Sequence, residues 1–374
     1  MARGPKIVIS GGGTGGHIFP AVSIAKEIIK KYPDALIQFI GANGRMEMER
    51  IPEAGFPIHG INIAGFQRKS LFKNIGLPAK LISSLFAVFK FLKKTKPDAV
   101  IGTGGYVSGP SLFVAQLLGI PTMIQEQNSL AGWTNRILSR KAKIICVAYP
   151  KMERFFLEKK ICLTGNPVRE NIAKIESNGL HKHNSAKAKS LLGFNPELPL
   201  ILVLGGSQGA KAINKSVQNN LKLWKNKKIQ ILWQCGAYYI DELKGEISNS
   251  KYLKIEPFIK NMDKAYVAAD IVVSRAGAGT ISEICCAGCA AILIPSPNVA
   301  EDHQTQNAKS LVDQKAAIFI DEKKSESDLG LIISELMINP DKLKYLRSNA
   351  LNISKPNAAA EILNQLENHW LWKN

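Results

Sequence analysis

The sequence has few cysteines and no long hydrophobic run. None of its apolar stretches reaches the roughly 18 residues that cross a bilayer. The first predicted strand begins within a few residues of Met1, without the apolar core of a signal peptide. We therefore expect a cytoplasmic protein whose six cysteines are reduced thiols rather than a disulfide framework. With 374 residues, the chain is long enough for two domains that each bury a core.

The first glycine-rich stretch lacks the residues that would complete two common nucleotide-binding motifs. Ser10–Pro20 reads SGGGTGGHIFP and contains the pattern Gly-x-Gly-x-x-Gly, which is typical of dinucleotide-binding turns. Such a site also needs an acidic residue after the second strand to hold a ribose, but Ala35–Ile40 is followed by Gly-Ala-Asn-Gly. No Gly-Lys-Ser or Gly-Lys-Thr follows, which excludes a P-loop. These absences argue against a nicotinamide-dependent oxidoreductase.

The same stretch contains a histidine, His17, in the predicted turn from a strand into a helix. Glycines let the backbone come close to a ligand, and a helix N-terminus presents unpaired N–H groups and a partial positive charge. An imidazole titrates near neutral pH, so a histidine beside such a turn suggests proton transfer at its rim. We predict that His17 is the candidate general base. The alternative is a structural role in holding the turn.

Acidic residues are absent between Ala54 and Pro97, and the net charge of +19 indicates an anionic partner. Two apolar lines at helical spacing run through this region, one of Leu77, Leu81, Leu85, Val88 and Leu92 and one of Ile75, Ala79, Ile82 and Leu85. We expect one stripe to pack in the core and the Leu71–Leu85 end to lie exposed at an anionic membrane surface. We expect no binding of nucleic acid, on the view that aromatic side chains are not interleaved with the lysines.

The opening pattern of the chain is repeated in its second half. Leu200–Leu204 is a predicted strand, and the glycine-rich turn Gly205–Ala210 follows it. Predicted strands alternate with helical patterns throughout, which favours parallel sheets with helices on both faces. We therefore predict an α/β fold of two Rossmann-like domains facing across a cleft, one of residues 1–166 with 355–374 and one of residues 167–354.

A second candidate site follows a predicted strand of the second half. Arg275–Glu283 reads RAGAGTISE and predicts the start of a helix, with Thr280 and Ser282 as capping residues. A helix N-terminus can hold a diphosphate, and the carboxylate of Glu283 suits a ribose diol. The alternative for Glu283 is an ordinary acidic residue near a helix N-terminus.

Together these motifs resemble those of MurG-type glycosyltransferases. The resemblance runs through GGGTGGHIFPA, the RME run at Arg45–Glu47, GTGGYVSGP, EQNSLAGWTN, TGNPVR, GGSQGA, RAGAGTISE and HQTQNA. It implies a GT-B fold and inverting transfer of N-acetylglucosamine from UDP-GlcNAc to the MurNAc 4-hydroxyl of undecaprenyl-pyrophosphoryl-MurNAc-pentapeptide (lipid I). The product, lipid II, is a precursor of peptidoglycan. The chain departs from the family pattern at Gln125, where histidine is common.

The resemblance also implies roles for individual residues. The implied substrate contacts are Thr14, Gly15, Gly16, Asn128, Arg169, Ser207, Ile259, Ala278, Gly279, Thr280, Ile281, Ser282, Glu283 and Gln304. Among them, Glu283 would hold the ribose, the backbone of Ile259 would meet the uracil, and Gln304 would lie near the sugar hydroxyls. No metal or other cofactor is expected, because helix N-termini and N–H groups would stabilise the departing diphosphate.

The partners implied by the resemblance are UDP-GlcNAc, lipid I, the anionic cytoplasmic face of the inner membrane and proteins of cell-wall synthesis. Two other kinds of function stay open. One is a different GT-B enzyme, such as a UDP-sugar epimerase or a glycolipid synthase; an epimerase would not need the basic amphipathic surface. The other is a membrane-associated sensor of nucleotide sugars, which would bind the donor without turnover and would tolerate the loss of His17.

Overall fold

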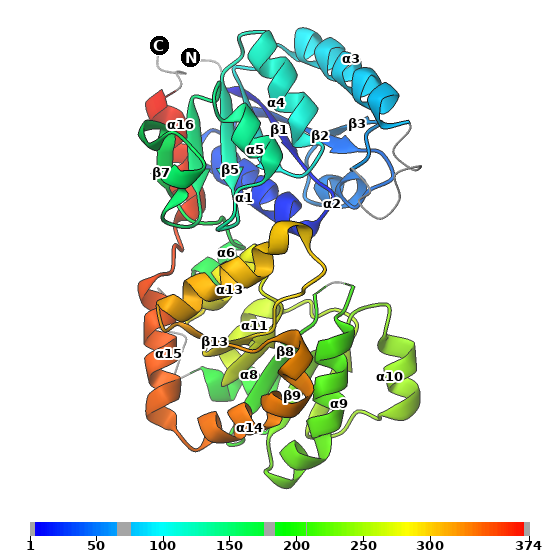
Figure 1. Ribbon diagram of the computed structural model, residues 1–374, viewed down its shortest axis with the longest axis vertical. Coiled ribbons are helices and arrows are strands. Elements are labelled where there is room, and N and C mark those ends of the chain that lie inside the picture. The colour runs from blue at the N-terminus through cyan, green and yellow to red at the C-terminus, as the bar shows by residue number, and fades with distance from the viewer. Residues whose placement is uncertain (1–3, 66–75, 176–183, 207, 370–374) are drawn as a thin grey trace. The chain divides into compact units, whose positions relative to one another are not determined.

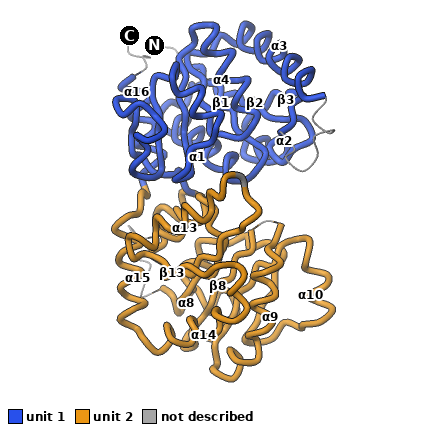
Figure 2. The backbone as a smooth tube through the Cα atoms, viewed as in Figure 1, with its two compact units in different colours: residues 1–168, 357–374 blue, residues 169–356 orange. Residues whose placement is uncertain are grey.

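The computed structural model describes residues 4–65, 76–175, 184–206 and 208–369. The chain divides into two compact units: unit 1 comprises residues 1–168 and 357–374, and unit 2 comprises residues 169–356 (Figure 2). Two residues with a predicted role, Ile75 and Ser207, lie outside the described residues. Each unit is built on one parallel sheet.

In the described residues of unit 1, seven parallel strands form a sheet in the order β3-β2-β1-β4-β5-β6-β7. The strands are β1 (Lys6–Gly11), β2 (Leu36–Ala42), β3 (Ile58–Ile61), β4 (Ala99–Gly104), β5 (Thr122–Glu126), β6 (Ile144–Val147) and β7 (Ile161–Leu163). The side chains of β4 are buried throughout, as are nearly all of those in β1, which is typical of central parallel strands. The strand order reverses between β1 and β4, where open α/β sheets bind their ligands.

Helices cover both faces of this sheet (Figure 1). They are α1 (Gly15–Lys31), α2 (Glu47–Glu53), α3 (Leu77–Thr95), α4 (Ser108–Leu117), α5 (Trp133–Leu138) and α16 (Ala358–His369), with 3₁₀ turns at Met152–Arg154 and Glu158–Lys160. On one face, Ile28 of α1 belongs to the same apolar cluster as Ile9 of β1. On the other, Val88 of α3 belongs to the cluster that contains Val8. The alternation of Val8 and Ile9 along β1 thus supplies both halves of the core.

The last helix, α16, packs against α1 at the start of the chain. Ile362 and Leu366 are buried in the core of unit 1. Glu367 accepts a hydrogen bond of 2.6 Å from the Tyr32 hydroxyl and pairs with Lys31 at 2.7 Å. The C-terminal helix therefore stabilises the same core as the first strand.

In the described residues of unit 2, six parallel strands form a sheet in the order β10-β9-β8-β11-β12-β13, which reverses between β8 and β11. The strands are β8 (Leu200–Leu204), β9 (Gln230–Gln234), β10 (Leu253–Glu256), β11 (Ile271–Ser274), β12 (Ala291–Leu293) and β13 (Ala317–Phe319). The helices are α6 (Glu170–Ala173), α8 (Ser185–Leu191), α9 (Lys211–Asn226), α10 (Ile240–Glu246), α11 (Met262–Ala268), α12 (Ala278–Cys286), α13 (His303–Asp313), α14 (Ser325–Met337) and α15 (Pro340–Asn352). Trp224 and Trp233 are fully buried between the sheet and its covering helices.

The burial of α3 changes along its length. Val88 and Leu92 are buried in the core, whereas Leu81, in the part of the helix that we expected to be exposed, is 46% exposed. Leu81 lies on the same side of the helix as Val88, two turns nearer the start of α3. Burial therefore depends on a packing neighbour as well as on the helical face. Ile82, which the sequence placed in the membrane patch, is 68% exposed.

Aromatic side chains do alternate with lysines on α3, so the premise on which nucleic-acid binding was argued against was wrong. Phe86 is 60% exposed and Phe89 is 41% exposed. The Lys90 ammonium lies 4.5 Å from the centre of the Phe86 ring, and that of Lys93 lies 5.8 Å from the Phe89 ring. The exposed part of α3 therefore presents apolar, aromatic and cationic groups together.

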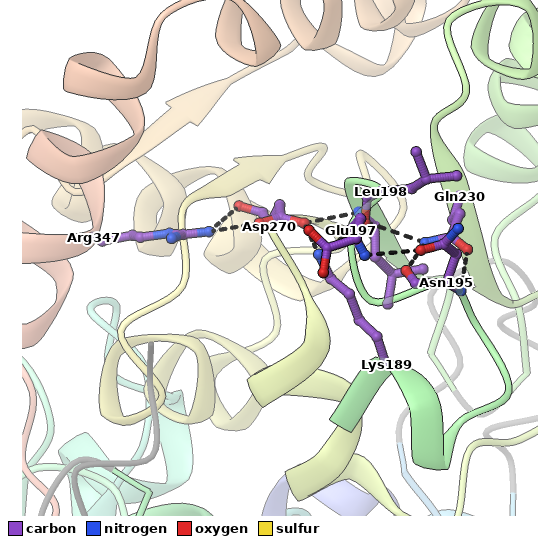
Figure 3. Close-up of polar contacts among 8 residues, drawn as sticks. Lys189, Asn195, Glu197, Leu198, Gln230, Asp270 and Arg347 are labelled. Carbon is purple, nitrogen blue, oxygen red and sulfur yellow. Dashed lines mark hydrogen bonds and ion pairs between the residues drawn. The ribbon is translucent and has the colours of Figure 1, made fainter. Parts of the chain in front are cut away.

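A network of polar contacts centred on Asp270 joins four segments of unit 2 (Figure 3). Lys189 of α8, whose side chain is only 7% exposed, donates to the Asp270 carboxylate at 2.8 Å. The backbone N–H of Leu200, at the start of β8, donates to the same oxygen at 2.8 Å. Arg347 of α15 lies 3.6 Å from the other carboxylate oxygen and donates to the Asp270 carbonyl at 2.8 Å. Because a buried ammonium needs a counter-charge, Lys189 depends on this carboxylate.

Replacing Asp270 with Asn should lower the free energy of unfolding by about 2 kcal/mol, because the variant leaves Lys189 without its negative partner. Chemical denaturation measures the change. The control is Glu335→Gln, which removes an exposed pair with Lys342 at 2.7 Å and should cost less than about 0.5 kcal/mol. Equal losses in the two variants would contradict the structural role of Asp270.

Candidate functional site

The glycine-rich turns lie at the two places where the order of a sheet reverses. In unit 1, residues 12–14 join β1 to α1, Gly104 is the last residue of β4, and Gly105 follows it. In unit 2, Gly205 follows β8 and Gly277 follows β11. At such a place the connections leave the two central strands in opposite directions, which leaves room for a ligand at the carboxyl edge of the sheet. Each unit therefore has a candidate site at this edge.

The glycine-rich turn after β1 leads into the N-terminus of α1, with Thr14 in the N-cap position. The Thr14 carbonyl accepts hydrogen bonds from the backbone N–H groups of His17 at 3.1 Å and Ile18 at 3.3 Å. Gly15 and Gly16 are the first two residues of the helix, and the backbone N–H groups at such a position have no intrahelical partner. With no acidic residue in that turn, the end of this 17-residue helix suits an anion.

A buried carboxylate, Glu47, holds the glycine-rich turn after β1 in place. One of its oxygens accepts from the backbone N–H of Gly13 at 3.0 Å, and the other accepts from that of Ala42 at 3.1 Å. A Cβ atom on Gly12 would lie 2.2 Å from the Glu47 carboxylate, so the turn can approach Glu47 only because Gly12 lacks a side chain. The sequence contained Glu47 in its RME run, but no role was predicted for it.

The ring of His17 faces the end of β4 and the segment after β5. Its Nδ1 atom lies 3.0 Å from the Thr103 carbonyl oxygen and 3.0 Å from Oε1 of Gln127. The Thr103 hydroxyl also donates to the His17 carbonyl at 2.9 Å. The sequence predicted a role for His17 but missed both of these neighbours, which come from distant parts of the chain.

The segment after β5 is shaped by a second buried carboxylate, Glu126. It accepts from the backbone N–H groups of Asn128 at 3.0 Å and Gly132 at 3.1 Å, and from the Asn135 side chain at 2.8 Å. Asn128 is one of the predicted substrate contacts. Glu126 therefore fixes the backbone that carries Asn128 at the carboxyl edge of the sheet.

In unit 2, two predicted substrate contacts, Arg169 and Glu283, form a bidentate ion pair with both N–O distances at 2.7 Å. The Tyr266 hydroxyl donates to the same carboxylate at 3.2 Å. Burial opposes the charged form of Arg169, but hydrogen bonding and attraction to Glu283 outweigh it, so the net effect raises the pKa of Arg169. Burial, with the charge of Glu283, raises the pKa of Tyr266 well above its usual value. At neutral pH the cluster thus contains a cationic guanidinium and a neutral phenol.

The start of α12 differs from the prediction. The N-cap residue is Gly277, and the cap has no side-chain hydrogen bond. Thr280 lies inside the first turn, and the Ser282 hydroxyl donates to the Ala278 carbonyl at 2.9 Å. The capping roles predicted for Thr280 and Ser282 were wrong, because a hydroxyl inside a helix bonds to the carbonyl one turn back. The first-turn N–H groups, which include that of Gly279, are still available to an anion.

The remaining predicted contacts of unit 2 lie after other strands of its sheet. Ile259 follows β10, and its N–H donates to Oε1 of Gln234 at 3.0 Å. Gln304 lies in the first turn of α13, and its Oε1 accepts from the backbone N–H of Ser296 at 2.9 Å. Ile281 is buried in α12. Ile259, Gln304 and the start of α12 therefore share the carboxyl edge of the sheet.

Within the described ranges, no three His, Cys, Asp or Glu side chains lie close enough together to hold a metal ion. The six cysteines are free thiols. Burial is the main cause that raises the pKa of Cys286 and of Cys289 to about 12. None of the helices in the same ranges combines the length and the apolar character needed to cross a membrane.

Comparison with known proteins gives consistent matches along the chain. The N-terminal domain model of glycosyltransferase family 28 matches residues 7–147, and the C-terminal domain model of that family matches residues 200–366. The chain is 47% identical over 361 residues to the UDP-N-acetylglucosamine–N-acetylmuramyl-(pentapeptide) pyrophosphoryl-undecaprenol N-acetylglucosamine transferase of Cytophaga hutchinsonii, and the alignment covers 96% of each chain.

Two solved structures extend this comparison. The crystal structure of MurG from Acinetobacter baumannii matches with a TM-score of 0.77 at 30% identity, covering 97% of this chain and 99% of that chain. A UDP-N-acetylglucosamine 2-epimerase matches with a TM-score of 0.66 at 13% identity, covering 98% of this chain and 97% of that chain. At that identity the second match shows a shared fold and nothing about the reaction.

Two parallel-sheet α/β units and the two family models define a glycosyltransferase of the GT-B fold. The identity to curated relatives over nearly the full length is more specific than the fold. The chain belongs to the family of MurG-type N-acetylglucosamine transferases. The predictions of fold class, family and enzyme class are therefore confirmed.

Proposed function

We propose that this protein transfers N-acetylglucosamine from UDP-GlcNAc to the MurNAc 4-hydroxyl of undecaprenyl-pyrophosphoryl-MurNAc-pentapeptide, with inversion at the anomeric carbon. The observation that carries the proposal is the identity, along nearly the whole chain, to a transferase whose name states this donor and acceptor. The geometry supports it, because each unit has an anion-binding helix N-terminus at the carboxyl edge of its sheet.

In this proposal residues 167–354 bind the donor. The first-turn N–H groups of α12 face the UDP diphosphate, and the Glu283 carboxylate accepts hydrogen bonds from the ribose diol. Arg169 holds Glu283 in place through its two hydrogen bonds and adds positive charge near the diphosphate. Ile259 meets the uracil through its backbone, and Gln304 lies near the sugar hydroxyls.

Residues 1–166 and 355–374 bind the acceptor in the same proposal. Thr14, Gly15 and Gly16 of this part of the chain, in the first turn of α1, and Asn128, after β5, are proposed contacts of the UDP-sugar donor. His17 is the general base. As the acceptor oxygen attacks the anomeric carbon, the bond from that carbon to the diphosphate oxygen breaks, UDP leaves with the electron pair, and the hydroxyl proton passes to the imidazole.

The test of the function is UDP release from UDP-GlcNAc, measured with lipid I analogue in detergent, without acceptor, and with an analogue that lacks the MurNAc 4-hydroxyl. Release should require the complete acceptor, and the product should be a disaccharide. Donor binding without transfer would instead indicate a nucleotide-sugar sensor. Formation of UDP-ManNAc without acceptor would indicate an epimerase. Either of the last two results would contradict the proposal.

We further propose that the protein binds the anionic cytoplasmic surface of the membrane through α3, as a peripheral protein. Ile82 and Phe86 are exposed apolar groups on a helix that has lysines and no acidic residue. Ala79 is exposed beside them, whereas Leu85 is partly buried against the core. Such a site brings the enzyme to an acceptor that is anchored in the bilayer. Proteins of cell-wall synthesis are further candidate partners.

Replacing Ile82 with Glu should weaken binding to vesicles that contain anionic phospholipid by about tenfold or more. An isoleucine that becomes buried in the membrane contributes roughly 1.5–3 kcal/mol to binding, and the anionic lipids repel the new carboxylate. Co-sedimentation measures the binding. The matched control is Leu331→Glu, at a leucine of unit 2 that is 72% exposed, and it should leave binding unchanged. Unchanged binding of Ile82→Glu would contradict the membrane site. Displacement of the wild-type protein by an oligonucleotide would point to nucleic acid instead.

A further inference from the structure

The environment of His17 defines which ring nitrogen carries a proton. Nδ1 lies 3.0 Å from the Thr103 carbonyl oxygen and 3.0 Å from Oε1 of Gln127. A backbone carbonyl oxygen can only accept a hydrogen bond. Nδ1 must therefore be the donor, and in the neutral imidazole Nε2 is the nitrogen with the lone pair. This assignment follows from the acceptors around the ring.

The orientation of the Gln127 amide is fixed by its other contacts. Its Nε2 atom donates to the Thr103 carbonyl, to the Gln125 carbonyl at 3.2 Å and to the Gln125 side-chain oxygen. A reversed amide would place an oxygen against all three of these oxygens. Oε1 of Gln127 must therefore face His17 and act as an acceptor.

The hydrogen bonds continue from Gln125 to Asn166 and from Asn166 back to the backbone of Gln127. Nε2 of Gln125 donates to Oδ1 of Asn166 at 3.0 Å, and Nδ2 of Asn166 donates to the Gln127 carbonyl at 3.0 Å. Gln125, Gln127 and Asn166 are each at most 2% exposed. A buried network in which each amide has a partner is rigid, because any rotation would leave polar groups unpaired at a high cost.

The backbone leaves space for the contact between His17 and Gln127. Gly104 has a φ of +99°, and a Cβ atom there would lie 2.7 Å from Nδ1 of His17 and 3.3 Å from Oε1 of Gln127. Any other residue at this position would push the ring and the amide apart. Gly104, at the end of β4, therefore leaves the space in which the ring of His17 meets the side chain of Gln127.

We propose that Gln127 is a positioning residue that, together with the Thr103 carbonyl, holds His17 as the Nδ1–H tautomer, so that Nε2 is the atom that takes the acceptor proton. This inference rests on the proposed function, in which His17 is the base. When the lone pair of Nε2 accepts the hydroxyl proton, the neutral imidazole becomes an imidazolium. Its Nδ1–H keeps the hydrogen bonds to Thr103 and Gln127, which are stronger when the donor is charged. The network therefore favours the product of proton transfer.

The test is the tautomer of His17 in the full-length protein, measured by ¹⁵N NMR after labelling of its histidines at a pH where the ring is neutral. The chain has six histidines, and the signal lost in His17→Asn assigns the one of interest. Wild-type protein should show His17 with Nδ1 protonated and Nε2 unprotonated. A wild-type spectrum in which Nε2 carries the proton would overturn the proposal without any variant.

A variant extends the test to turnover. Gln127→Met should increase the fraction of His17 that carries its proton on Nε2. The kcat should fall roughly tenfold, which is part of the factor of about 100 or more that a positioned base supplies. The KM for UDP-GlcNAc should stay within about twofold. The control is Gln116→Met, since Gln116 bonds to Thr122 and to the Leu138 carbonyl rather than to His17, and it should change neither readout.

The outcomes separate this inference from the function on which it rests. If Gln127→Met leaves both the His17 spectrum and kcat as in wild type, Gln127 does not position His17, although the transferase can still be real. If the spectrum changes and kcat does not, Gln127 sets the tautomer as proposed, but His17 is not the base.

Discussion

The geometry of the candidate site in unit 1 depends on two hydrogen bonds between Thr103 and His17. The Thr103 hydroxyl donates to the His17 carbonyl, and the Thr103 carbonyl accepts from the His17 ring. These bonds join the turn after β1 to the end of β4, which are the two strands at the reversal of the sheet order. A Cβ atom on Gly11 would lie 1.9 Å from the Thr103 hydroxyl oxygen. At Gly11, as at Gly12, the glycine makes room for a polar side chain from another part of the chain.

The two units use the same topology with different chemistry. In unit 1, a side-chain amide and a backbone carbonyl accept from the ring of a histidine and orient it. In unit 2, a partly exposed ion pair between Arg169 and Glu283 lies near the start of α12, where charges suit the recognition of a diphosphate and a ribose. This difference agrees with a reaction in which one unit handles a proton and the other a charged leaving group.

Much of this could be predicted from the sequence because it depends on local patterns. Apolar runs followed by glycine-rich turns predicted β1 and β8, and their repetition predicted two parallel-sheet units. The contacts that complete the site could not be predicted in the same way. Gln127 and His17 are 110 residues apart, and only the order of the strands brings them together. The role of Glu47 depends likewise on β2 lying beside β1.

The predicted caps of α12 were wrong because a local pattern does not determine where a helix begins. Ser282 is a residue type that caps helices, yet α12 begins four residues before it and the hydroxyl bonds within the helix. The residue type was interpreted correctly, but its position relative to the start of the helix was not.

If His17 removes the acceptor proton while donor recognition depends on unit 2, replacing His17 should slow turnover without weakening donor binding. The most direct test is the turnover of His17→Ala at saturating UDP-GlcNAc and lipid I analogue, with donor binding measured in parallel by calorimetry. The kcat should fall by about 100-fold or more, and the Kd for UDP-GlcNAc should stay nearly unchanged. Near-normal turnover at saturating substrates would contradict this role of His17.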